Sequence, residues 1–296
     1  MSNNLRVKSS KFIDKTTNVS FKFNGKTYHG FKGDTLASAL IANGIHLVGR
    51  SFKYHRPRGI MTAGSEEPNA IVQVGNDKAI TEPNVRATEA EIHDGLEATS
   101  QNCWPSVKFD IGGINNLIAP FLPAGFYYKT FMWPASFWEK YEYFIRHSAG
   151  LGKSPTKPDP DIYDHKYVHC DVLVIGAGIS GIMAAKTAAK NNFKTILLDE
   201  KAEIGGTTIY QNSDNFKINN KVSSHWLNEE ISELKKLENL EIKTRTSVAA
   251  YHGYNYLLAR ENLTDHLSKT EKKNKIRQRL LKIRAKKVIV ATGSLE

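Results

Sequence analysis

The stretch "CDVLVIGAGISGIMAA", residues 170–185, decides the fold class of this chain. It contains a continuous apolar run at 172–175, which is typical of a strand buried on both faces of a parallel sheet. Three glycines, Gly176, Gly178 and Gly181, follow in the spacing GxGxxG, and a helical pattern comes after them. The stretch therefore predicts the strand, turn and helix of a dinucleotide-binding unit.

Each glycine of this motif has a physical role in holding a diphosphate. Gly176 permits the tight turn out of the strand, Gly178 lets the backbone approach a pyrophosphate, and Gly181 lets the helix lie close to the sheet. The first residues of the helix, Ile179 and Ser180, contribute N–H donors and positive potential. We therefore expect these five residues to bind the diphosphate of a cofactor.

An acidic side chain follows the second predicted strand, "KTILLDE". Asp199 lies 23 residues after Gly176, where its carboxylate could accept hydrogen bonds from a ribose diol. Glu200 is the alternative, and the register of the strand decides between them. Gly205 and Gly206 follow just after this acidic position and are further candidates. The strand at 288–290 runs into a small-residue turn, Ala291, Thr292 and Gly293; it resembles the strand that, in flavoproteins with two dinucleotide-binding folds, returns beside the first one, with its turn passing the cofactor.

The N-terminal hundred residues predict a different kind of module. Residues 18–31 alternate apolar and polar side chains around an Asn-Gly turn, which favours a β-hairpin. The next segment, "GDTLASALIANG", predicts a helix with Asp34 as its N-cap and Gly44 as its C-terminal stop. A long loop and a strand at "AIVQVG" follow. We expect a small β-grasp-like, α+β module.

The middle of the chain is rich in aromatic residues and interrupted by prolines. Ala135 to Ile145 could form a helix that exposes several aromatic side chains. These side chains either pack the segment onto its neighbours or form a partner interface. We therefore expect an α/β chain in three parts: a β-grasp module over 1–100, an aromatic linker over 101–168, and part of a Rossmann-like FAD/NAD(P)-binding fold over 169–296.

Length and composition limit the classes of protein to which this chain can belong. The 296 residues are enough for about two domains, and no stretch approaches the roughly 18 apolar residues of a membrane span. No apolar run follows the charges of the N-terminus, so we expect no signal peptide and no membrane association. The two cysteines, Cys103 and Cys170, are isolated, which argues against a disulfide framework or a metal site and favours the cytoplasm.

The net charge of +11 is concentrated in one segment. Residues 269–287 contain ten Lys or Arg and one Glu, so they carry nine of the eleven net charges. No aromatic residue interleaves with these charges, which weakens a single-strand stacking site. We expect a solvated hairpin whose second arm is a strand after Arg279, and no nucleic-acid partner; a nucleic-acid or anion-binding module is the alternative.

No catalytic constellation stands out in the sequence. The ten histidines are scattered, and we expect His225 and His252 to be surface or structural residues. No residue is predicted to be catalytic or to bind a metal.

Four blocks of sequence resemble the alpha subunit of heterotetrameric sarcosine oxidases, in the same order. They are "GDTLASALIANGIHLVGRSFKYHRPRGIMTAGSEEPNA", "LPAGFYYKTFMWPASFWEKYE", "YVHCDVLVIGAGISGIMAA" and "LLARENLTDHL". The resemblance runs from about residue 18 to the end, and the second block is specific to this family.

This resemblance implies a non-catalytic subunit that binds NAD at Gly176, Gly178, Gly181, Asp199 or Glu200, and the turn at Ala291–Gly293. Beta, gamma and delta subunits are the implied partners, with FAD and FMN bound at the beta subunit. There, sarcosine is oxidised to glycine and formaldehyde, or to methylene-tetrahydrofolate, with release of hydrogen peroxide. The alternative is an FAD-binding fragment that oxidises another N-methylated amine.

Two departures from the family shape further expectations. Related modules carry cluster cysteines in the loop before the last strand, but residues 59–70 contain no cysteine. Since such clusters need thiolate ligands, we expect a ferredoxin-like scaffold without an iron–sulfur cluster. "SFKYHRPRG" is then expected to face another subunit or an anionic ligand.

The chain also stops at Glu296, before the family's remaining dinucleotide fold and folate-binding domain. We therefore expect a fragment that is poorly soluble and weakly binding alone.

Overall fold

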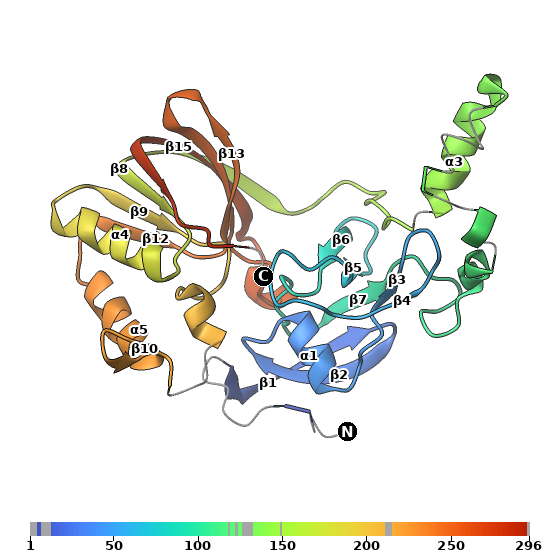
Figure 1. Cartoon of the computed structure of the whole chain (residues 1–296), viewed down its shortest axis with the longest axis horizontal. Helices are drawn as coiled ribbons and strands as arrows, with labels where there is room; N and C mark the ends of the chain where they lie inside the picture. The colour runs from blue at the N-terminus through green and yellow to red at the C-terminus, as the bar shows by residue number, and fades with distance from the viewer. Residues whose placement is uncertain are drawn as a thin grey trace. The chain divides into compact units, whose positions relative to one another are not determined.

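A computed structural model of the chain describes residues 5–6, 13–117, 119–121, 124–125, 133–148, 150–210 and 215–294. The chain divides into two compact units (Figure 1). The first is built mainly from Ile13–Pro160, and the second from Asp161–Asp265 and the segment that begins at Thr270. The three-part division expected from the sequence stays a prediction.

The first unit is organised around a five-stranded mixed sheet with the order β2-β1-β7-β5-β6. Its strands are β1 (Asp14–Phe23), β2 (Lys26–Lys32), β5 (Ile71–Val74), β6 (Glu82–Arg86) and β7 (Leu96–Ser100). The predicted hairpin is confirmed, since β1 pairs antiparallel with β2 through a turn in which Asn24 and Gly25 have positive φ angles of 49° and 75°. A parallel pairing of β1 with β7 joins the hairpin to the rest of the sheet.

The helix of this module, α1 (Leu36–Ala42), begins one residue later than expected. Thr35, not Asp34, is the N-cap: its side chain accepts from the N–H of Ser38, and the Ser38 side chain accepts from the N–H of Thr35. Asp34 is fully buried instead, and its carboxylate accepts from Arg6, Phe31 N–H and Ser38 Oγ. The predicted stop is confirmed, because Gly44 follows the helix with a φ of 74°.

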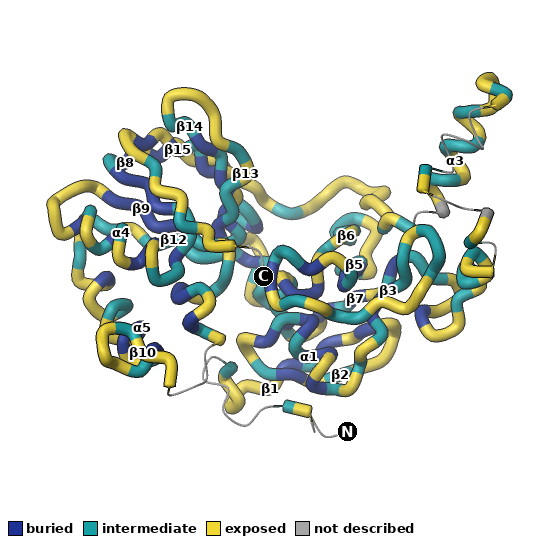
Figure 2. The backbone as a smooth tube through the Cα atoms, viewed as in Figure 1, coloured by how far each residue is buried: buried dark blue, intermediate teal, exposed yellow. Residues whose placement is uncertain are grey.

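The core of the first unit lies between α1 and the sheet. Phe21 and Phe23 of β1 are nearly fully buried, as are Leu36 and Leu40 of α1. Figure 2 shows these segments of α1 and its sheet in dark blue. Since burial of such a side chain stabilises by about 1.5–3 kcal/mol, this small core holds the module together.

The remaining elements of this unit are short. They are β3 (Gly49–Arg50), β4 (Pro57–Arg58), η1 (Ile111–Asn116), η2 (Ala119–Phe121), η3 (Ala135–Phe137) and α3 (Trp138–Ser148). The predicted aromatic helix is therefore confirmed, with a first turn of 3-10 type. Phe137 and Phe144 are 45% and 68% exposed, as expected for a helix that presents aromatic side chains.

The second unit contains a six-stranded sheet with the order β12-β9-β8-β15-β14-β13. The strands are β8 (Ile162–Ile175), β9 (Thr195–Leu198), β12 (Leu240–Lys243), β13 (Thr246–His252), β14 (Tyr256–Asn262) and β15 (Ile276–Val290). β12, β9, β8 and β15 are parallel to one another, and β14 and β13 extend the sheet by antiparallel pairing. The predicted Rossmann-like pattern of β8, helix and β9 is confirmed.

The two long strands differ most from the expectation. β8 begins at Ile162, before the predicted strand and across the predicted boundary at residue 168. β15 pairs antiparallel with β14 and begins at Ile276, before the expected start after Arg279, so most of the basic run belongs to this strand. The reason is alternation: Leu281, Ile283 and Ala285 are buried, while the cations between them point to the other face.

Each face of this sheet is covered by a different layer. Val172, Val174 and Leu197 pack with α4 (Ile179–Lys190) and α5 (Ser223–Leu234) in one core. On the other face, Ile196 and Leu198 of β9 pack against Leu257 and Ala259 of β14, so the antiparallel strands curl over the parallel ones. The other elements are η4 (Gly206–Tyr210), β10 (Lys217–Ile218), β11 (Lys221–Val222), η5 (Gly253–Asn255) and α6 (Lys269–Lys272).

No helix within the described ranges is long and apolar enough to cross a membrane.

Candidate dinucleotide site

The predicted site residues converge at one edge of the second sheet. β8, β9 and β15 are parallel, so their carboxyl ends lie at the same edge. The N–H of Gly176 donates to Leu198 O at 2.8 Å, and the N–H of Ala291 donates to Ile175 O at 2.8 Å. The turn after β8 is therefore held between the ends of its two neighbouring strands.

Gly176 and Gly181 are glycines because other atoms occupy the space of a side chain. Gly176 has a φ of 95°, and a Cβ there would lie 2.4 Å from Ala291 O. A Cβ on Gly181 would lie 1.8 Å from Gly176 O, within the diameter of an atom. The expected roles, a tight turn and a close approach of helix to strand, match this geometry.

Gly178 has a different environment. A Cβ on this residue would meet only Gly206 Cα, at 4.0 Å, so it would project into open space. A Cβ on Gly206, which has a φ of 55°, would lie 2.8 Å from Gly178 Cα. Gly178 and Gly206 thus form two sides of a shallow backbone cradle, and a side chain on Gly178 would fill it.

The cradle lies at the N-terminus of α4. Gly178 is the N-cap, and among the residues that the structure describes no side chain caps this first turn. No acidic residue occupies the turn either. The N–H groups of Ile179, Ser180 and Gly181 belong to the donors that an α-helix cannot satisfy internally. Together with the helix dipole, they make this turn suited to a phosphate group.

Asp199 is already engaged by the backbone. Its Oδ2 accepts from the N–H of Ala177 at 2.6 Å, and its Oδ1 accepts from the N–H of Lys201 at 2.8 Å. Burial raises the pKa of this carboxyl, although the two N–H donors offset part of the effect. Asp199 therefore ties the end of β9 to the glycine turn. Glu200 is exposed at the same strand end, which favours it as the ribose-binding carboxylate.

The remaining predicted residues fall into two groups. Gly205 is buried, and a Cβ there would lie 2.7 Å from Leu227 Cδ2 and 2.9 Å from Ile209 Cγ1, so a side chain has no room; its assignment to the site stays a prediction. Thr292 and Gly293 are exposed beside the turn after β8, where a Cβ on Gly176 would lie 3.1 Å from Thr292 Cα. Their assignment to the site stays a prediction.

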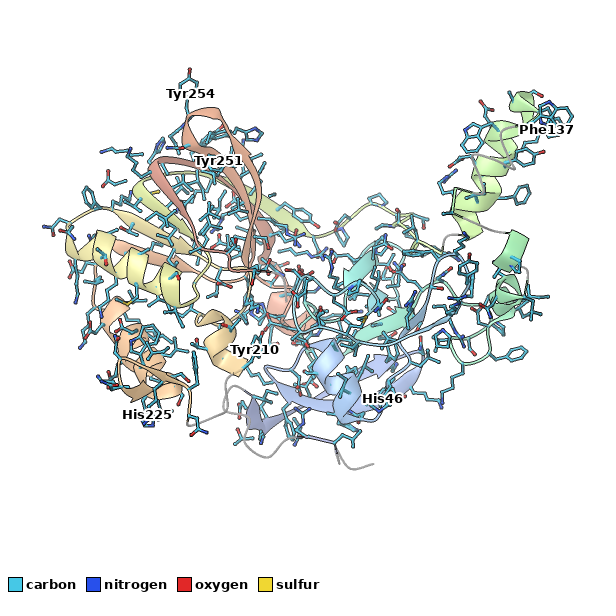
Figure 3. All side chains as sticks on the ribbon, in the orientation of Figure 1. His46, Phe137, Tyr210, His225, Tyr251 and Tyr254 are labelled. Carbon is cyan, nitrogen blue, oxygen red and sulfur yellow. The ribbon has the colours of Figure 1, made fainter. Side chains whose placement is uncertain are left out.

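Sequence reasoning missed one pair at this edge. Lys201 Nζ donates to the hydroxyl of Tyr210 at 3.1 Å and lies 4.8 Å from the centre of its ring. Tyr210 ends η4, the element that begins at Gly206, and Figure 3 labels it. The Tyr210 hydroxyl raises the pKa of Lys201 against the opposing effect of burial. No signal in the sequence indicated the pair, because the contact depends on how η4 folds back toward β9.

The first unit contains a second polar feature, in the loop expected to be a scaffold. Glu67 is 1% exposed. Its Oε2 accepts from the N–H groups of Met61 and Thr62 at 2.8 and 2.7 Å, and its Oε1 accepts from those of Asn69 and Ala70 at 2.8 and 3.1 Å. These four donors lower the pKa of Glu67 below its ordinary value, against the effect of burial. Glu67 thus fixes the loop.

A cavity of 330 Å³ lies beside this loop, within the first unit. Arg50, Lys53 and Arg58 contribute cations to its lining, and Asn69 contributes an amide. Two of these cations come from the "SFKYHRPRG" stretch. Its expected role toward an anion or a subunit stays a prediction.

The fold and this edge of the sheet define a ferredoxin-like module joined to a Rossmann-like dinucleotide-binding unit. Two family models match accordingly: a 2Fe-2S iron-sulfur cluster binding domain over residues 16–103, and an FAD dependent oxidoreductase over residues 171–290. The expected fold class is confirmed.

The chain is similar in sequence to sarcosine oxidase alpha subunits, as its sequence blocks indicated. It is 47% identical over 292 residues to the subunit from Rhizobium meliloti (strain 1021), covering 98% of this chain and 29% of that protein. It is 32% identical over 286 residues to the subunit from Corynebacterium sp. (strain U-96), covering 96% of this chain and 25% of that protein. The chain thus spans between a quarter and a third of the length of these relatives.

A solved structure shares the fold across almost the whole chain. L-proline dehydrogenase from P. horikoshii superposes with a TM-score of 0.57 at 19% identity, covering 97% of this chain and 43% of that one. At this identity the likeness supports the architecture alone.

Two cofactor expectations are corrected by the family matches. NAD is not supported, because the second unit matches FAD-dependent oxidoreductases. The expectation that the first module holds no iron–sulfur cluster is also contradicted, because residues 16–103 match a 2Fe-2S iron-sulfur cluster binding domain. Within the described residues, however, no group of three or more His, Cys, Asp or Glu side chains is placed to hold a metal. The described side chains therefore offer no such set of ligands.

Proposed function

We propose that this chain binds FAD at the carboxyl edge of its second sheet and functions in the oxidation of sarcosine, within a multi-subunit oxidoreductase. The observation that supports this most is the open cradle between Gly178 and Gly206 at the uncapped start of α4. The FAD-dependent family match covers the same residues. The alpha-subunit relatives suggest the substrate and the presence of other subunits.

The residues of the site have separate parts in this proposal. The N–H groups at the start of α4 bind the diphosphate, and Gly178 leaves room for its oxygens. Glu200 accepts hydrogen bonds from the ribose hydroxyls. Asp199 holds the glycine turn in place through the N–H of Ala177. Bound FAD would supply the two-electron oxidation of a carbon–nitrogen bond, which no side chain can perform.

FAD binding can be tested on the chain itself by calorimetry and by quenching of flavin fluorescence. Gly178→Ala keeps an allowed backbone, since the φ of Gly178 is −73°, but places a methyl group in the cradle. We expect this variant to lose at least tenfold in FAD affinity with an unchanged unfolding midpoint. Gly113→Ala, whose Cβ meets nothing within 4 Å, is the matched control. Equal FAD affinity for all three proteins, or tighter binding of NAD, would overturn the proposal.

A further inference from the structure

In the fold, the basic run of residues 269–287 lies beside residues that are far from it in the sequence. Within β15, Lys282 and Arg284 point away from the buried core. Lys282 lies directly opposite Tyr167 on β8, and Arg284 lies directly opposite Tyr256 on β14. Lys282 Nζ lies 4.9 Å from the centre of the Tyr167 ring, and Arg284 Cζ lies 5.0 Å from that of Tyr256. The cations are therefore interleaved with tyrosines.

These side chains share one surface, which we call the outer face. It is the side of β8, β15 and β14 opposite their core, over 163–169, 278–284 and 256–262. Tyr163 and Tyr167 on it are 51% and 65% exposed. At its end, Arg284 donates to Tyr254 O at 2.9 Å, and Figure 3 shows Tyr254 at the tip of the β13–β14 hairpin.

The described residues of these three segments place no carboxylate on the outer face, although Asp265, beyond the end of β14, accepts from Gln278 at the Tyr163 end. The acidic side chains of these three segments, Asp164 and Glu261, lie on the opposite side, where both accept from Arg279. Asp171 lies beyond the end of the face and pairs with Lys286 at 2.8 Å. Lys282, Arg284 and Arg260 thus have no acidic partner on their own side within the part of the chain that the structure describes.

We infer that the outer face binds an acidic polypeptide segment of a partner protein. Charge complementarity requires an anionic partner, and tyrosines are enriched among the anchors of protein interfaces. Nucleic acid fits less well, because stacking on bases needs open ring faces, whereas Lys282 and Arg284 already cover one side of Tyr167 and of Tyr256. The hydroxyl edges remain suited to carboxylates. The alpha-subunit relatives make a protein partner the expected source.

The probe is a fluorescein-labelled 20-residue poly-L-glutamate. Its binding to the full chain is measured by fluorescence anisotropy. Charge reversal on the face, Lys282→Glu with Arg284→Glu, is expected to weaken binding at least tenfold. The same change of charge outside the face, Lys273→Glu with Lys275→Glu, is expected to weaken it less than threefold. Arg260→Gln and Tyr167→Leu test the face with smaller perturbations, and each should weaken binding severalfold while the unfolding midpoint stays unchanged.

Three results would overturn the inference. The first is absence of binding by the unmodified chain at about 100 mM salt, where exposed charges still interact. The second is equal weakening by the two charge reversals, which would show dependence on net charge alone. The third is an equal or higher affinity for a 20-residue oligothymidylate with the same dependence on Lys282 and Arg284, which would assign the face to nucleic acid.

Discussion

Two carboxylates, the buried Glu67 of the first unit and the partly buried Asp199 of the second, hold loops by accepting backbone N–H groups, but their pKa values shift in opposite directions. Glu67 accepts four backbone N–H groups from residues 61–70, and its pKa is lowered. Asp199 accepts only two, and its pKa is raised by burial. Four donors thus outweigh burial at Glu67, whereas two donors offset only part of its effect on the pKa of Asp199.

The two loops also differ in what they leave for a ligand. Glu67 uses the donors of its own loop, so that loop is fixed by the chain itself. Asp199 lies behind the glycine turn and fixes its shape, but the first turn of α4 in front of it has no side-chain cap. We infer that the second unit keeps its donors for a phosphate, whereas the first uses them for folding.

The glycine turn would be broken most severely by Gly181→Ala. The new Cβ would lie 1.8 Å from Gly176 O, and neither β8 nor α4 can shift without disturbing the core. We expect a loss of about 4 kcal/mol or more in the free energy of unfolding of the second unit. Urea denaturation followed by circular dichroism would measure it. Gly113→Ala is again the control, and a loss below about 1 kcal/mol would contradict the packing shown here.

Glu67→Gln should disrupt the Glu67 loop and cause the next largest loss in the free energy of unfolding. One amide NH2 group would face two N–H donors, leaving them unsatisfied, so we expect a loss of about 3 kcal/mol at pH 7. Because the pKa of Glu67 is lowered from its ordinary 4.5, its stabilisation is present above that value. It is lost as the pH falls through the folded-state pKa.

The difference between wild type and Glu67→Gln should therefore shrink as the pH falls below about 4.5. Chemical denaturation between pH 7 and pH 3 measures this change. Glu89→Gln, at an exposed ion pair with Arg86, is the matched control and should cost less than about 0.5 kcal/mol. A pH-independent difference would mean that Glu67 is not ionised in the folded chain.

Asp199→Asn tests the carboxylate that Glu67 is compared with. The variant loses one acceptor, but it also removes a carboxylate whose ionisation the fold disfavours, so we expect a loss of only about 1 kcal/mol at pH 7. Since the folded pKa is raised above 3.8, wild type gains stability as the pH falls through it. The deficit of the variant should then grow at low pH, opposite to Glu67→Gln. The same denaturation series reports both signs, and parallel trends would refute the contrast.

Glu200→Gln should have the smallest effect on folding. The side chain is exposed at the end of β9, so we expect a change below about 0.5 kcal/mol in stability. Its proposed hydrogen bonds to ribose predict a loss of about tenfold in FAD affinity. Calorimetric titration with FAD measures this loss, with Glu203→Gln as the exposed control. An unchanged affinity would remove Glu200 from the site.

Local patterns were enough to predict much of the site. The GxGxxG spacing, the apolar strand and the helix after it lie next to one another in the chain, so Gly176, Gly178 and Gly181 could be assigned roles without the fold. The β1–β2 hairpin followed from its Asn-Gly turn for the same reason. Asp34 was misassigned because Thr35 offered a competing cap, which only the position of Arg6 and Ser38 beside Asp34 resolved.

By itself, the sequence determined the class of fold and the glycine turn that is proposed to bind a diphosphate, because both depend on residues a few positions apart. Only the tertiary structure showed that both oxygens of Asp199 are engaged by N–H groups, those of Ala177 and Lys201. The tertiary structure also showed that the basic run contains cations interleaved with aromatic rings, because strand pairing places Tyr167 and Tyr256 beside Lys282 and Arg284. Contacts across strands join residues far apart in the chain, and no local pattern records them.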